Sequence, residues 1–107
     1  MKTQNDYFAN TAVVQQHLDE PGTRIRPGDW YIAKRNGPPQ VLKCQSVNDD
    51  AGWVNPVPET PGYSFDIHEC RPFKNSVAEQ TMQAIYVQCR KEVLEWQEST
   101  KRSRLKL

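Results

Sequence analysis

Residues 75–99 read NSVAEQTMQAIYVQCRKEVLEWQES, and this stretch decides the fold of the chain. Large apolar or sulfur-containing side chains recur in it at spacings of four, three, four and three residues: Met82, Tyr86, Cys89, Val93 and Trp96. This spacing is typical of one apolar face of an α-helix, because a turn takes ~3.6 residues. Ser76 and Glu79 have the spacing of a capping box, which marks the start of a helix. We therefore expect a long amphipathic helix over residues 75–100.

The apolar face of this helix has three candidate neighbours. Packing on the chain's own sheet is the simplest of them. A second copy of the helix also fits, because paired helices show the same alternation of four and three residues. A foreign protein fits as well, because Met, Tyr and Trp are enriched in protein interfaces. The sequence leaves these three alternatives open.

The segment before the helix has the pattern of a run of short strands. Aromatic and β-branched residues, which favour strands, gather in four places: residues 30–35, 40–47, 53–54 and 63–68. Turns rich in Gly, Pro, Asn and Asp separate these places: residues 26–29, 36–39, 48–52 and 60–62. We therefore expect a small antiparallel sheet or barrel, because strands follow one another at intervals of about ten residues.

Alternation along two of these strands predicts which side chains share a face. In the last strand it directs Tyr63, Phe65 and Ile67 inward and the polar residues between them outward. In the second strand it places Val41 and Val47 on the same face. Leu42 and Cys44 are expected on the opposite face of the same strand.

The N-terminal part of the chain is less regular. Residues 10–19 favour a short helix, although the β-branched pair Val13-Val14 keeps a strand as the alternative. Pro21 and Gly22 end this element in either case. A chain of 107 residues is expected to form one domain. Its parts are an N-terminal arm (1–22), a β-rich core (23–74), the helix (75–100) and a basic tail (101–107).

The expected fold class is α+β: a small antiparallel SH3-like barrel or curled sheet, with a short N-terminal helix and a long C-terminal amphipathic helix. The order of turns and strands, from Gly28-Asp29-Trp30 to the stretch GYSFDIHEC at residues 62–70, resembles that of small SH3-like β-barrels. Many short proteins of phages and mobile elements look like this. The resemblance covers about half of the chain and rests on the pattern of turns and strands.

Composition limits the possible settings of the protein. The formal net charge is +1 and the mean hydropathy is −0.83, so no strong overall field attracts nucleic acid or a membrane. The three cysteines have no CxxC spacing, and no apolar stretch near the start has the form of a signal peptide. We therefore expect a cytoplasmic protein that does not bind membranes.

Catalytic and metal-binding patterns are weak in this sequence. The five glycines form neither a dinucleotide-binding nor a phosphate-binding motif. His68, Cys70 and Cys44 are the best candidates for metal ligands, but a structural zinc site needs four ligands, usually in close pairs. A cysteine nucleophile next to a histidine has no supporting signature either. We expect no enzymatic activity, no metal and no cofactor.

The preferred interpretation is a small protein-binding module, of the inhibitor or adaptor kind that phages and mobile elements encode, acting on a host protein. Its expected hydrophobic anchors are Tyr86, Trp96 and Met82 on the helix and Trp53 in the loop region. Self-association into a dimer is a second way of using the same residues.

The alternative is a nucleic-acid-binding accessory protein. The basic C-terminal tail can neutralise several phosphates: its residues are Lys101, Arg102, Arg104 and Lys106. Lys34 and Arg35 add two cations beside Trp30 and Tyr31, which can stack on bases if they are exposed. The competing interpretation is that Trp30 belongs to the core and that the tail is a solvated terminus.

Overall fold

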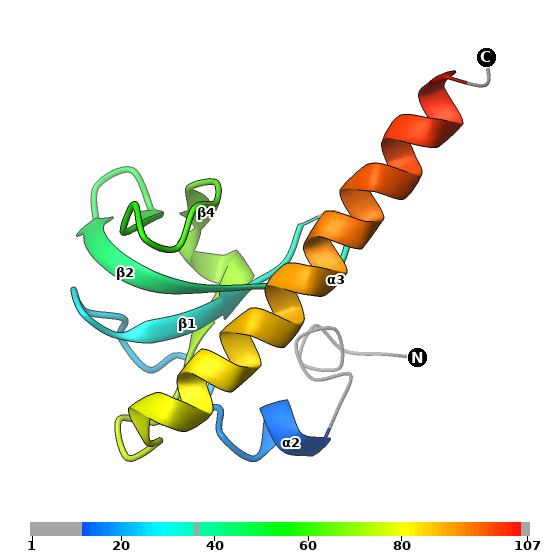
Figure 1. Cartoon of the computed structure of the whole chain (residues 1–107). Coiled ribbons are helices and arrows are strands. Elements are labelled where there is room, and N and C mark those ends of the chain that lie inside the picture. Colours follow the sequence, from blue (N-terminus) through cyan, green and yellow to red (C-terminus); the bar gives the residue numbers. More distant parts are fainter. Residues whose placement is uncertain (1–11, 36, 106–107) are drawn as a thin grey trace, which may run out of the picture.

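The structure is a computed structural model that describes residues 12–35 and 37–105. It confirms the α+β class: an open five-stranded antiparallel sheet, with strand order β4-β3-β2-β1-β5, carries one long C-terminal helix (Figure 1). The strands are β1 (Trp30–Ala33), β2 (Gln40–Asn48), β3 (Trp53–Pro56), β4 (Phe65–Asp66) and β5 (Cys70–Pro72). The helices are α2 (Ala12–Gln15), the 3-10 turn η1 (Ile67–Glu69) and α3 (Glu79–Leu105). In the described part of the chain, no helix combines the length and the apolar character needed to cross a membrane.

The long strand β2 belongs to both halves of the sheet. Its first residues pair with β1, its later residues pair with β3, and the register with β3 shifts between Cys44 and Ser46. Such a bulge bends a strand and reverses which face the following side chains occupy. Val41 therefore packs under α3, whereas Val47 packs against the opposite cluster. The expectation that these two valines share a face was wrong, because the bulge interrupts the alternation.

Two apolar clusters lie on opposite faces of the bent sheet. The cluster beneath α3 contains Leu18, Trp30, Ile32, Val41, Phe73, Met82, Ile85 and Cys89. The cluster on the other face contains Ile25, Tyr31, Ala33, Leu42, Cys44, Val54 and Phe65. All four residues of β1 are buried, since alternate side chains enter the two clusters. This explains why β1 is a continuous apolar run.

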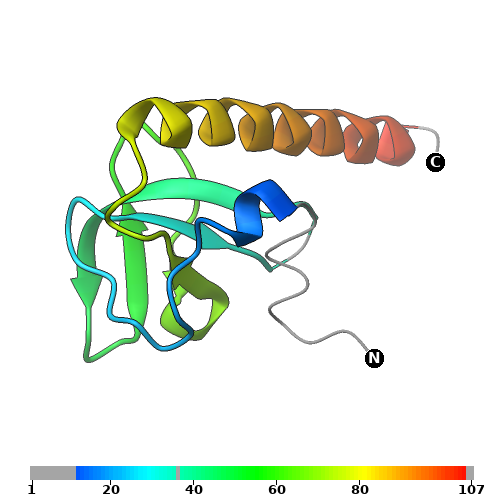
Figure 2. The ribbon, with the colours of Figure 1, turned by 90° about the horizontal axis from the view of Figure 1, so that it is seen from below.

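The helix α3 differs from its expected span at both ends. Ser76 lies in a turn three residues before the first helical residue, so the predicted capping box is not formed. The carboxylate of Glu79 instead accepts hydrogen bonds from Trp30 Nε1 at 3.3 Å and Gln83 Nε2 at 3.4 Å, which ties the first turn to β1. At the other end the helix continues to Leu105, so most of the expected basic tail is helical. Figure 2 shows this end extending past the sheet.

Two further expectations need correction. The helix predicted over residues 10–19 is reduced to the single turn α2. Leu18, near the end of the predicted helix, instead forms an isolated bridge with Phe73. Residues 10 and 11 lie outside the described part of the chain, as do residues 1–9. The predicted strand over residues 63–68 is β4 followed by η1. Asp66 caps η1, because its side chain accepts a hydrogen bond from the His68 amide and Glu69 completes a capping box.

Candidate functional site

A groove lies where α3 passes over the end of the sheet, and we call it the α3 groove. It has a volume of about 570 Å³. Its walls come from the β1–β2 loop, from β2, from the segment that enters β4 and from α3. The lining residues are Arg35, Pro38, Gln40, Tyr63, Phe65, Val93, Trp96, Gln97, Thr100 and Lys101. The groove therefore joins segments that are up to 66 positions apart in the sequence, from Arg35 to Lys101.

Two aromatic side chains give the groove its exposed apolar surface. Tyr63 is 65% exposed and Trp96 is 41% exposed. The buried ring of Phe65 also contributes to the lining. Large aromatic side chains gain much from burial against a partner, because each can bury ~150–250 Å². The pair Tyr63 and Trp96 is thus the part of the groove best suited to an apolar ligand group.

Trp96 is held in place by the β1–β2 loop. Gly37 has a positive φ of 76°, and a Cβ on Gly37 would lie 2.7 Å from Cε2 of Trp96. The indole ring therefore lies directly against the backbone of this glycine. Lys34 Nζ donates a hydrogen bond to the carbonyl of Gly37, which ties the end of β1 to this loop. This contact restricts the movement of the indole before any partner binds.

Arg35 forms a fixed wall of the same groove. Its Nε and Nη2 donate to the two carboxylate oxygens of Glu69 at 2.9 and 2.8 Å, and its guanidinium carbon lies 5.1 Å from the centre of the Phe65 ring. The same carboxylate accepts the backbone N–H of Asp66. The hydrogen bond from Arg35 lowers the pKa of Glu69 and raises the pKa of Arg35 itself. Both groups stay charged at neutral pH, and most of the charge of Arg35 is compensated.

The four hydrophobic anchors predicted from the sequence do not lie together in the structure. Met82 is 1% exposed and belongs to the cluster beneath α3, so it is not available to a partner. Tyr86 is half-buried, with its ring 5.9 Å from that of Trp30. Trp53 is 40% exposed at the start of β3 and does not line the α3 groove. Of the four anchors, Trp96 alone is in the groove.

The cations predicted for nucleic acid are also distributed unevenly. Arg35 and Lys101 line the α3 groove, whereas Lys34 is bonded to the loop carbonyl of Gly37. Lys106 lies outside the described residues, while Arg102 and Arg104 lie in the last turns of α3. Basic residues there are favourable for the helix itself, because they offset the negative end of its dipole. Trp30 is 8% exposed, so it is part of the core and is not available to stack on a base.

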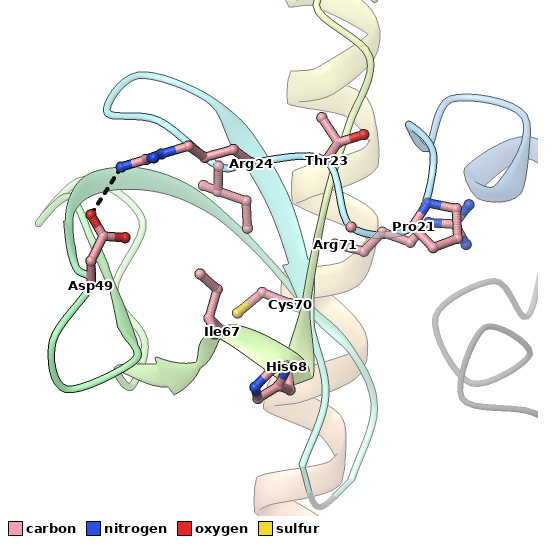
Figure 3. Close-up of a pocket in the computed structure, with 10 residues that line it drawn as sticks. Pro21, Thr23, Arg24, Asp49, Ile67, His68, Cys70 and Arg71 are labelled. Atoms are coloured by element: carbon pink, nitrogen blue, oxygen red, sulfur yellow. Dashed lines mark hydrogen bonds and ion pairs between the residues drawn. The ribbon is translucent and has the colours of Figure 1, made fainter.

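A second pocket contains two of the residues that the sequence suggested for metal or thiol chemistry, His68 and Cys70, whereas Cys44 does not line it. Its volume is about 470 Å³, and Figure 3 shows Cys70 and His68 on one side of it, with the Arg24–Asp49 ion pair across from them. Burial, with a smaller contribution from nearby Glu69 and Asp66, raises the pKa of the Cys70 thiol to about 12. The thiol is therefore protonated at neutral pH, and it lies 3.4 Å from the carbonyl of Asp66 as a hydrogen-bond donor.

The other two thiols have the same character. Burial raises the pKa of Cys89 to about 11 and also raises the pKa of Cys44. A nucleophilic cysteine needs a lowered pKa, because the thiolate is the reactive species. Among the described residues, no group of three or more His, Cys, Asp and Glu side chains is placed to hold a metal ion. The geometry thus gives thiol chemistry no support.

Tyr63 is the residue of the groove that sequence reasoning misplaced. Strand alternation predicted that Tyr63 faces inward, together with Phe65 and Ile67. Phe65 is buried and Ile67 is partly buried against the same cluster, but Tyr63 lies before the first residue of β4 and is exposed. The preceding Pro61-Gly62 pair was the available signal, since such a pair favours a loop.

Comparisons of the chain with models of protein families, with curated proteins and with solved structures each found no match.

Proposed function

We propose that this protein is a non-enzymatic binding module that holds a protein partner in the α3 groove. The observation that supports this most is the pair of exposed aromatic side chains, Tyr63 and Trp96, in one groove. Binding hot spots are enriched in Tyr and Trp and lie in pockets from which water can be excluded. The packing of Trp96 on Gly37 adds preorganisation, which reduces the entropy lost on binding.

The polar part of the groove suits an extended polypeptide. Gln40 and Gln97 can each donate and accept hydrogen bonds, and Thr100 adds a hydroxyl group. A peptide backbone carries one donor and one acceptor per residue, so it matches such a lining. We propose that the partner contributes an extended segment, with an apolar side chain against Tyr63 and Trp96.

We further propose that the sheet belongs to the group of SH3-like folds. Two features support this reading: the fifth strand returns beside the first, and β2 bends to serve both halves of the sheet. Our proposal does not depend on this resemblance, since the groove is built partly from α3.

Selection from a displayed library of random peptides tests the proposed function. The purified protein is immobilised, binding peptides are selected, and their affinities for two variants are then measured. We expect Tyr63→Ala to weaken binding by about tenfold or more, the range of a hot-spot residue. Val87→Ala is the matched control, because Val87 is 63% exposed on α3 and does not line the groove.

Three outcomes contradict the proposal. These outcomes are a selection that yields no binder, binders that tolerate Tyr63→Ala, and binders that Val87→Ala weakens equally. Circular dichroism of each variant checks that the fold is retained; Tyr63 is suitable because most of its side chain is exposed.

A further inference from the structure

The lining of the α3 groove has one sign of charge. Arg35 and Lys101 are its two charged side chains, and no carboxylate is among the described residues that line it. A groove lined by one sign of charge favours ligands of the opposite sign, because its low-dielectric walls focus the field. An anionic ligand is therefore the expected occupant on electrostatic grounds.

The two cations contribute differently. The guanidinium of Arg35 is engaged by both carboxylate oxygens of Glu69, so the groove is close to neutral at this end. Lys101 lies exposed on α3, five residues after Trp96, and also lines the groove. The positive potential is thus concentrated at the Lys101 end, next to the exposed aromatic surface.

We propose that the ligand of the α3 groove is an acidic, extended peptide segment. An apolar or aromatic side chain of the segment contacts Tyr63 and Trp96, and Asp or Glu residues beside it pair with Lys101. This inference rests on the proposed function, since it names the chemistry of the partner for the same groove.

A protein segment fits these observations better than a single-stranded nucleic acid does. A nucleic acid carries a phosphate on every nucleotide and needs a continuous basic track. Here Arg35, one of the two cations of the groove, is already paired with Glu69, and the formal net charge of the chain is only +1. A peptide can instead place its few carboxylates at the cationic end and a neutral backbone along Gln40 and Gln97.

The test uses the same displayed library of random peptides, with a pair of charge-reversal variants. Lys101→Glu reverses the charge at the groove, and Lys91→Glu makes the same change at an exposed position of α3 that does not line it. We expect peptides selected on the wild-type protein to be enriched in Asp and Glu beside an aromatic residue. We expect Lys101→Glu to weaken the binding of these peptides by about two- to fivefold or more. We expect Lys91→Glu to leave their affinity nearly unchanged.

Two further probes sharpen the result. A Gln version of the best acidic peptide, in which every Asp and Glu is replaced, is expected to bind more weakly and with less dependence on salt. Single-stranded oligothymidylate is the nucleic-acid probe, and we expect it to bind more weakly than the acidic peptide at physiological salt.

The outcomes separate the two proposals. If the selected peptides need Tyr63 but are not acidic and ignore Lys101→Glu, the inference about charge is wrong and the proposed function stands. If no Tyr63-dependent peptide is found, the proposed function fails and the inference fails with it. If oligothymidylate binds more tightly than every peptide, and through Tyr63 and Lys101, the ligand is a nucleic acid and the inference is overturned.

Discussion

The two parts of α3 have the same local structure but different surroundings. From Glu79 to Val93, one face of the helix is buried through Met82, Ile85, Cys89 and Val93. Beyond Val93, the helix carries the exposed Leu94 and Trp96 and then a polar stretch. The apolar stripe continues across this boundary, so one sequence pattern serves two purposes. The first part completes the core, and the second part forms a wall of the α3 groove.

The largest expected effect comes from the buried part of the helix. Met82→Ala should reduce the free energy of unfolding by about 2–5 kcal/mol, because it leaves a cavity in a core that is otherwise filled. Leu94→Ala is the matched change in the exposed part and should cost much less, since Leu94 is 48% exposed. Urea denaturation of both variants measures the difference. Equal losses would contradict the assignment of Met82 to the core and of Leu94 to the exposed surface of α3.

The contact between Trp96 and the β1–β2 loop gives the next largest effect. Gly37→Ala should destabilise the fold by about 1–3 kcal/mol, because alanine is strained at a positive φ and its Cβ meets the indole ring. The same change in a Trp96→Ala background should cost less, since only the backbone strain remains. A double-mutant cycle by thermal or urea denaturation gives this coupling. No coupling would mean that the indole does not rest on the loop in solution.

A smaller change, this time a gain in stability, is expected from Tyr31 on the face of the sheet opposite α3. The Tyr31 hydroxyl is buried, and the structure gives it no hydrogen-bond partner among the described residues. Burial also raises the pKa of Tyr31. Tyr31→Phe should therefore stabilise the fold by about 1 kcal/mol, because it removes a polar group that loses its contact with water on folding. A loss of stability in urea denaturation would show that the hydroxyl has a partner, such as a bound water.

The smallest effect concerns the ion pair that forms the fixed wall of the groove. Arg35 lowers the pKa of Glu69, so the pair stabilises the fold above the ordinary glutamate pKa of ~4.3. This contribution is lost as the pH falls through the lower pKa of the folded state. Its size should be only about 0.2–1 kcal/mol, because Arg35 is 43% exposed. Stability measured from pH 7 to pH 3 should fall less in Glu69→Gln than in the wild type; identical profiles would contradict the role of the pair.

Much of the architecture could be predicted from local patterns. The stripe from Met82 to Trp96 predicted the helix, and the turn residues predicted the separate strands, because both signals depend on neighbours in the sequence. The β-bulge in β2 could not be read in this way, since it depends on pairing with β3. The placement of Val47 was therefore wrong.

The candidate site was only partly predictable for the same reason. Trp96 was identified from its residue type and position, whereas its contact with Gly37 depends on how α3 crosses the sheet. Tyr63 was misplaced, because the strand that holds Phe65 begins two residues later than alternation suggested. The end of α3 was set too early, since the basic residues that suggested a tail also favour the C-terminus of a helix.

The most direct test of the α3 groove is an NMR titration of the ¹⁵N-labelled protein with an acidic peptide selected from the library. We predict that the largest chemical-shift changes fall on Gly37, on Tyr63 and on the indole N–H of Trp96. Changes concentrated at Trp53, or around the His68–Cys70 pocket, would contradict the assignment of the groove as the binding site.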